Sequence, residues 1–187
     1  TEQPNWVKPV EVPSSSNVSK YDVIGGAYSA LIDQQKNLVE EADFTHLVFN
    51  VLTNGGVKSM SEISIPYDTA YQHVEFHYLY VWRNGKKMDR TSDLSFEFLR
   101  NESLLDMSMY TGRVTAYEIL EDIRRGDKLE YAYTIIGDNP IFEKKQFQFQ
   151  PLIQTNPVDY LSIRFLTDKE VDYTTRCNAC ESLTITE

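Results

Sequence analysis

The chain has 187 residues and a formal net charge of −10, and 12% of its residues are aromatic. A chain of this length can form one domain with a hydrophobic core that needs no disulfide or metal for stability. The Lys and Arg residues form no basic stripe, which argues against nucleic acid and anionic membrane surfaces as partners. No apolar run reaches the roughly 18 residues of a membrane-spanning helix, so we expect no membrane insertion.

Residues 1–20 are rich in Pro, Ser and Val and show no periodicity, so we interpret them as an extended N-terminal arm or linker. Trp6 and Val7 are the residues that could anchor it to the body. Residues 21–187 form the predicted module, and the sequence leaves open whether the module continues beyond the chain end. The stretch 27–35 (AYSALIDQQ) is ambiguous and allows a short helix.

Residues that favour strands dominate from residue 36 onward. Alternation over residues 37–53 places Phe44 and Val48 on one face and Leu47 and Phe49 on the other, which indicates a bulge or burial on both faces.

Turn residues then punctuate the chain. Asn54-Gly55-Gly56 predicts a hairpin turn. A short strand is expected after this turn, and Pro66 is expected to end that strand.

Residues 71–83 read as a strand that ends in a type I′ turn at Asn84-Gly85. The even positions form the expected core face: Val74, Phe76, Tyr78, Tyr80 and Trp82. The odd positions place His73, Glu75 and His77 together on the other face, which makes these three residues the candidate metal ligands.

Strand geometry weakens this metal site. Residues four apart on a strand have β-carbons roughly 13 Å apart, whereas an ion lies only about 2 Å beyond an imidazole nitrogen. His73 and His77 therefore barely reach one ion, and a complete site needs ligands from a neighbouring strand. We expect a polar sheet face here, and keep a metal-dependent enzyme as the alternative.

The second half of the chain continues the β pattern. Residues 113–123 and 128–137 predict two strands joined by a turn at Gly126-Asp127, with Leu129, Tyr131, Tyr133 and Ile135 on one face. Further strands are expected near residues 144–150, 158–167 and 182–187. In all, about nine strands with little helix predict an all-β fold, an antiparallel β-sandwich.

The remaining motifs do not indicate a catalytic activity. Cys177 and Cys180 form a single C-x-x-C in a β-rich tail, without the second pair that zinc sites usually have, and their redox state stays open. The chain has three histidines, and we assign no catalytic residue and expect no cofactor. The tyrosines allow a third hypothesis, a carbohydrate-binding module with an exposed aromatic surface.

Residues 116–142 (AYEILEDIRRGDKLEYAYTIIGDNPIF) resemble a domain of unknown function that precedes a transglutaminase-like domain in large secreted bacterial proteins. The resemblance rests on an acidic pair, a Gly-Asp turn at Gly126-Asp127, a Tyr-x-Tyr-Thr strand and Asn139-Pro140. It covers roughly residues 36–150. In physical terms these turn residues are fold determinants, because Gly126 can take a positive φ and Asp127 can bond back to the turn.

The resemblance implies a β-sandwich that is exported to the periplasm or the cell exterior. It also implies a papain-like Cys-His-Asp domain further along the parent chain, which is the expected partner. The expected function is therefore that of a non-catalytic module, not an enzyme, which acts in domain packing or in binding a protein or a glycan.

Overall fold

A computed structural model describes residues 1–14, 16, 18–19, 23, 25–100, 112–142 and 156–170. Its described residues form nine strands, one α-helix and two short 3₁₀ turns: β1 (Ala27–Asn37), β2 (Ala42–Val51), α1 (Asn54–Met60), β3 (Glu62–Asp68), β4 (His73–Arg83), β5 (Lys86–Asp89), η2 (Thr91–Asp93), β6 (Glu97–Arg100), β7 (Arg113–Ile119), β8 (Lys128–Ile136), η4 (Pro140–Phe142) and β9 (Leu161–Leu166). The predicted all-β class is confirmed.

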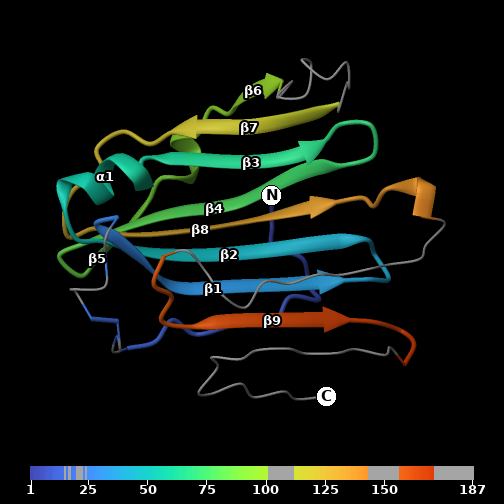
Figure 1. Ribbon diagram of the computed structural model, residues 1–187, viewed down its shortest axis with the longest axis horizontal. Coiled ribbons are helices and arrows are strands. Elements are labelled where there is room, and N and C mark those ends of the chain that lie inside the picture. Colours follow the sequence, from blue (N-terminus) through green and yellow to red (C-terminus); the bar gives the residue numbers. More distant parts are fainter. Residues whose placement is uncertain are drawn as a thin grey trace.

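The strands form two sheets (Figure 1). Sheet A has the order β5-β4-β8-β2-β1-β9, and sheet B has the order β3-β7-β6. Every pairing is antiparallel except that of β1 with β9, which is parallel. The prediction of an antiparallel sandwich with about nine strands is therefore correct, with one parallel pair at the edge of sheet A.

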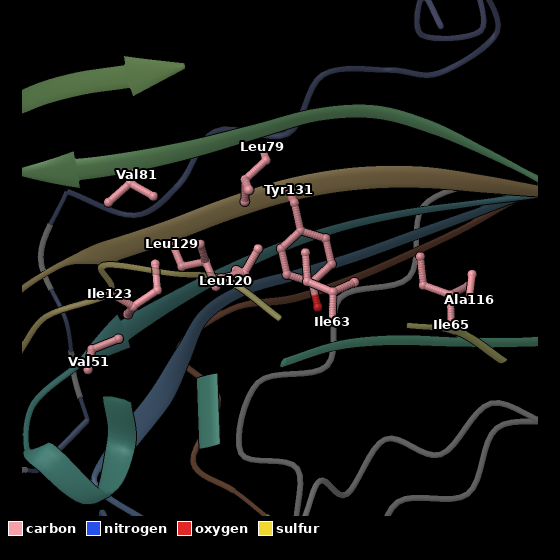
Figure 2. Close-up of a cluster of buried hydrophobic side chains, with 10 residues drawn as sticks. All are labelled: Val51, Ile63, Ile65, Leu79, Val81, Ala116, Leu120, Ile123, Leu129 and Tyr131. Carbon is pink, nitrogen blue, oxygen red and sulfur yellow. The ribbon is translucent and has the colours of Figure 1, made fainter. Parts of the chain in front are cut away.

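One hydrophobic core joins the two sheets. Figure 2 shows Tyr131 of β8 at its centre, pointing toward Ile63 of β3. Leu120 and Ile123, which follow β7, close the same core. We call the side of sheet A that contributes to this core the inner face, and the opposite side the outer face.

The stretch 27–35 is a strand and not a helix. β1 lies between β2 and β9, so its backbone groups are paired on both sides. After a bulge between Ser29 and Leu31, its side chains alternate between the two faces, with Leu31, Asp33 and Gln35 buried on the outer face. Pairing with two neighbouring strands overrides the local helical tendency of this sequence.

The predicted hairpin at residues 54–56 is wrong, because these residues begin helix α1. Thr53 caps the helix, and its hydroxyl accepts a hydrogen bond from the backbone nitrogen of Gly56 at 3.2 Å. Gly56 lies so close to Gly26 that a β-carbon there would be 2.0 Å from the Gly26 carbonyl oxygen. The absence of a β-carbon at both glycines therefore allows the helix to contact the chain at the start of β1.

Pro66 does not stop its strand. It lies inside β3 and pairs with Thr115 of β7. Because β3 is an edge strand of sheet B, the missing N–H of the proline can face away from the ladder without loss of a sheet hydrogen bond.

The β4–β5 hairpin confirms the predicted turn, since Asn84 and Gly85 have positive φ values of 51° and 76°. The core face predicted for β4 is only half right. A bulge between Phe76 and Tyr78 leaves His77 as an extra residue and reverses the alternation after it. Val74 and Phe76 pack against the core, but the next residues to do so are Leu79 and Val81.

Other expectations have mixed outcomes. The inward face of β8 is as predicted, with Leu129 and Tyr131 in the core and Tyr133 and Ile135 packed against it. The predicted strands at 144–150 and 182–187, together with Cys177 and Cys180, lie outside the described residues. Within the described ranges, no helix has the length and apolar character needed to cross a membrane.

Candidate functional site

His73, Glu75 and His77 all lie on the outer face of sheet A, as the strand pattern predicts, but they do not converge. His73 Nε2 is 3.9 Å from Glu75 Oε1, and the His73 side chain is 63% exposed. His77 occupies the bulge and is buried. No group of three His, Cys, Asp or Glu side chains suited to a metal ion occurs among the described residues.

Both ring nitrogens of His77 have partners. Nε2 lies 2.7 Å from the Thr134 hydroxyl, and Nδ1 lies 3.2 Å from the Thr1 hydroxyl. The ring also stacks on Phe44, with centroids 5.9 Å apart. Burial lowers the pKa of His77 below its ordinary value of 6.5. The His77 ring is therefore neutral and is hydrogen-bonded to its neighbours on the outer face of sheet A.

The predicted turn at Gly126-Asp127, after β7, contains a buried charged side chain. Gly126 has the positive φ expected of it, 92°. The Asp127 carboxylate is only 1% exposed and accepts a hydrogen bond from the backbone nitrogen of Arg124 at 2.8 Å. Arg83 of β4 donates to both oxygens of Asp127, each at 2.8 Å. Arg83 therefore joins the end of β4 to this turn.

The second pair of motif residues lies after β8. The Asn139 side chain accepts a hydrogen bond from the backbone nitrogen of Ile141 at 3.0 Å, which makes a local turn. Pro140 begins the short η4 turn that follows. Both residues shape the chain at the end of sheet A where β8 ends.

The outer face of sheet A carries the arm, which we define as residues 1–14. Val7 is buried against Phe44 and Ala132, with Trp6 and Tyr78 beside them. Further along, Val10 and Val12 pack against a second cluster on this face: Ala30, Leu31 and Val48. Figure 1 shows the N-terminus near the middle of sheet A.

A buried polar group holds the arm's main chain. Gln35 accepts from the Lys8 nitrogen at 3.0 Å and donates to the Lys8 oxygen at 2.6 Å. Arg164 Nη1 donates to Gln35 Oε1 at 3.0 Å and to the Trp6 oxygen at 2.9 Å. We call Gln35 and Arg164 the arm bracket.

Asp33 orients this bracket. Its Oδ2 accepts from Gln35 Nε2 at 2.8 Å. Burial raises the pKa of Asp33, and the hydrogen bond from Gln35 opposes this rise. Since Arg164 only donates and Asp33 faces the amide nitrogen, the two side chains together fix which way the Gln35 amide points.

A row of aromatic rings follows β4 on the same outer face. Tyr78 and Tyr80 stack with centroids 4.6 Å apart, and Trp82 donates from its indole nitrogen to Glu130 at 2.7 Å. Lys87 lies 3.4 Å from the centroid of the Tyr80 ring, and Lys128 lies 4.5 Å from that of Trp82. Lysine ammonium groups thus cover ring faces that a sugar would need for stacking.

His46 and Glu130 complete this side of the sheet. His46 Nε2 lies 3.3 Å from Glu130 Oε1, and the His46 ring meets Tyr78 edge to face. Burial acts to raise the pKa of Glu130, but the adjacent His46 ring and the hydrogen bond from Trp82 outweigh it and lower that pKa.

Sequence reasoning missed the arm bracket. The available signal was the alternation of Asp33 and Gln35 in a segment with strand composition, together with Arg164 between apolar residues. Polar side chains at alternate positions of a buried strand need partners, but the sequence does not say that the partner is the arm's main chain.

The sequence matches the family described as "Domain of Unknown Function with solved-structure structure (DUF3857)" over residues 40–186. The chain belongs to this family. The predicted resemblance to a domain of unknown function is thereby confirmed, and the transglutaminase-like domain downstream stays a prediction. The DUF3857 match begins after β1, so the arm and β1 lie outside it although β1 is an inner strand of sheet A.

Two solved structures are similar to this DUF3857 chain. One is a "putative protease" from Parabacteroides distasonis, with 15% identity, a TM-score of 0.51 and coverage of 60% of this chain. This chain spans only 23% of the length of that protein. The likeness shows that the fold is shared.

The other is a CBM3a-L domain from a scaffoldin of the Clostridium thermocellum cellulosome, with 11% identity and a TM-score of 0.39; the similarity covers 62% of this chain and 70% of that domain. No curated protein matches the sequence.

Proposed function

We propose that this chain is a non-catalytic module of an exported bacterial protein, which precedes a transglutaminase-like domain and packs against it. Membership of DUF3857 over residues 40–186 is the observation that carries the proposal. A periplasmic or extracellular location follows from the same resemblance. The Parabacteroides distasonis protein supports it, because a similar fold there accounts for 23% of a chain that is named for protease activity.

The side chains of the site also support a role without catalysis. His77 uses both ring nitrogens in hydrogen bonds, and His46 pairs with Glu130. The Asp127 carboxylate is held by Arg83. These groups are engaged in holding strands and turns together, so a substrate would have to compete with the fold for them.

Strand β6 offers a contact surface for the downstream domain. Phe98 is 64% exposed and Leu99 is 48% exposed, on a strand that forms the edge of sheet B. Adjacent exposed apolar side chains on an edge strand are typical of a protein contact. We propose that these two residues lie in the interface with the transglutaminase-like domain.

The test begins with the full gene product. The residues that follow Glu187 are expected to include a Cys-His-Asp domain, which is then produced separately and titrated with this module in a calorimeter. Binding is expected to weaken at least tenfold with Phe98→Ser and Leu99→Ser combined. Val39→Ser is the matched control, because Val39 is 58% exposed but lies on the β1–β2 turn of sheet A.

Two results contradict this proposal. Absence of a catalytic domain from the gene product, or absence of any contact between the two parts, removes its basis. Stoichiometric metal in the purified protein that is lost in His77→Ala favours the metal-dependent enzyme instead.

A glycan is the second candidate partner, and the aromatic row Tyr78, Tyr80 and Trp82 is the observation that favours it. Binding requires Lys87 to leave the face of Tyr80. On a glycan array, a hit that disappears with Trp82→Ala supports this role, and an array without hits contradicts it.

A further inference from the structure

We infer that the outer face of sheet A is a binding site for an extended peptide, and that it accepts the arm of a second copy of this chain. The site consists of the apolar socket around Phe44 and Ala132 and of the arm bracket, Gln35 and Arg164. The inference is independent of the proposed downstream domain.

The outer face of sheet A needs a cover. Sheet B packs only on the inner face of sheet A, through the core around Tyr131. The outer face nevertheless carries fully buried apolar side chains, with Phe44 at 2% exposure and Ala132 at 0%. The arm supplies their cover through Val7. Without that cover, the outer face would expose a contiguous apolar surface to water.

The arm is held through its main chain. The bracket bonds to the nitrogen and oxygen of Lys8 and to the oxygen of Trp6, all of them main-chain atoms. Such contacts accept any extended peptide, and the side-chain socket then selects the sequence. The socket takes a valine, and Val10 and Val12 fit a second apolar cluster further along.

The bracket is held by the body of the protein and not only by the arm. Asp33 and Arg164 both bond to the Gln35 amide from the body side. Side chains that are already oriented lose less freedom on binding, which favours a defined site over a casual contact.

The arm of a second copy is the occupant that matches this site. All contacts between the arm and sheet A are non-covalent, so the arm of a second copy can make the same set of contacts. Exchange of identical segments between copies is a common route to dimers, and local concentration decides between the two arrangements. We therefore expect monomers in dilute solution and arm-exchanged dimers at high concentration.

A peptide-binding measurement tests the site. The substitution Val7→Asp in the full chain is expected to empty the socket and leaves the residues of the socket unchanged; circular dichroism checks that the chain stays folded. A labelled peptide of residues 1–14 is then expected to bind this variant, measured by fluorescence anisotropy. The same peptide carrying Val7→Asp is the control and is expected to bind at least tenfold more weakly. Adding Gln35→Ala to the Val7→Asp chain is expected to weaken binding of the unmodified peptide at least tenfold.

A mass measurement tests the partner. Native mass spectrometry of the unmodified chain over rising concentration is expected to show dimers, and the Val7→Asp chain is expected to stay monomeric. A folded Val7→Asp chain that binds no peptide overturns the inference. Peptide binding without dimers at any concentration overturns the assignment of a second copy as partner. If Val7→Asp does not fold, displacement of the arm in the unmodified chain by excess peptide gives the same decision.

Discussion

His77 and Thr134 lie on adjacent strands of sheet A and meet across the bulge in β4, with Nε2 2.7 Å from Oγ1. The contact uses the bulged residue, which has no partner in the ladder between β4 and β8. The bulged residue His77 is thus held by a side-chain hydrogen bond and not by pairing of its main chain with β8.

This contact predicts a loss of stability in mild acid. Burial favours the neutral ring, so the pKa of His77 lies below 6.5 in the folded protein and returns to about 6.5 on unfolding. Below pH 6.5 the unfolded chain therefore binds more protons, and the free energy of unfolding falls as pH decreases toward the folded pKa. Above pH 6.5 this contribution is fully retained.

Urea unfolding between pH 7.5 and 5.5 measures this effect. His77→Gln keeps a polar side chain but cannot titrate, so its slope against pH should be flatter than that of the unmodified chain. Identical slopes for the two proteins would show that His77 does not titrate with unfolding.

Removal of the Asp127 carboxylate should strongly destabilise the fold. Asp127→Ala removes the acceptor of Arg83 Nε and of the Arg124 backbone nitrogen, at a site that is 1% exposed. Breaking one side of a buried ion pair typically costs about 3 kcal/mol. Asp122→Ala is the control, because Asp122 also contacts Arg83 but its side chain is 47% exposed. Denaturant midpoints that shift equally in the two variants would contradict a special role for Asp127.

Two neighbouring glycines of α1 should respond in opposite ways to alanine. Gly55→Ala places its β-carbon no closer than 3.5 Å to Thr53 Oγ1. The substitution is therefore expected to raise the free energy of unfolding by about 0.5–1 kcal/mol. Gly56→Ala places its β-carbon 2.0 Å from the Gly26 carbonyl oxygen, so α1 and β1 must move apart. Thermal unfolding should show a raised midpoint for the first and a lowered midpoint for the second. A raised midpoint for Gly56→Ala would mean that the two segments are not in contact.

The bulge makes a prediction about two adjacent residues of β4. Leu79 is 2% exposed in the core, whereas Tyr80 lies half-buried on the outer face. Leu79→Ala should cost about 2–5 kcal/mol of stability, and Tyr80→Ala clearly less. The reverse order in chemical denaturation would place the even positions of β4 in the core throughout and would remove the bulge.

Local sequence signals predicted the elements that depend on local chemistry. Asn84-Gly85 forms the expected turn because both residues accept a positive φ, and β8 shows the expected alternation because one face is packed on the core. Gly126 takes its expected conformation for the same reason.

Errors occurred where a distant contact decides the structure. Asn54-Gly55-Gly56 forms a helix because Thr53 caps it and Gly26 lies against Gly56. Pro66 stays within β3 because that strand is at a sheet edge. The bulge at His77 has no local marker, and its position depends on partners in β8 and in the arm.

The parallel pairing of β1 with β9 has a consequence for synthesis of the protein. Ile32 lies opposite Leu161, which follows it by more than one hundred residues. Closing so long a loop is slow, and on the ribosome β1 must wait with an open edge until residues 161–166 have emerged. Nascent chains that pause before β9 is made therefore present that edge to other nascent chains, and we expect chaperone binding to be concentrated at this stage.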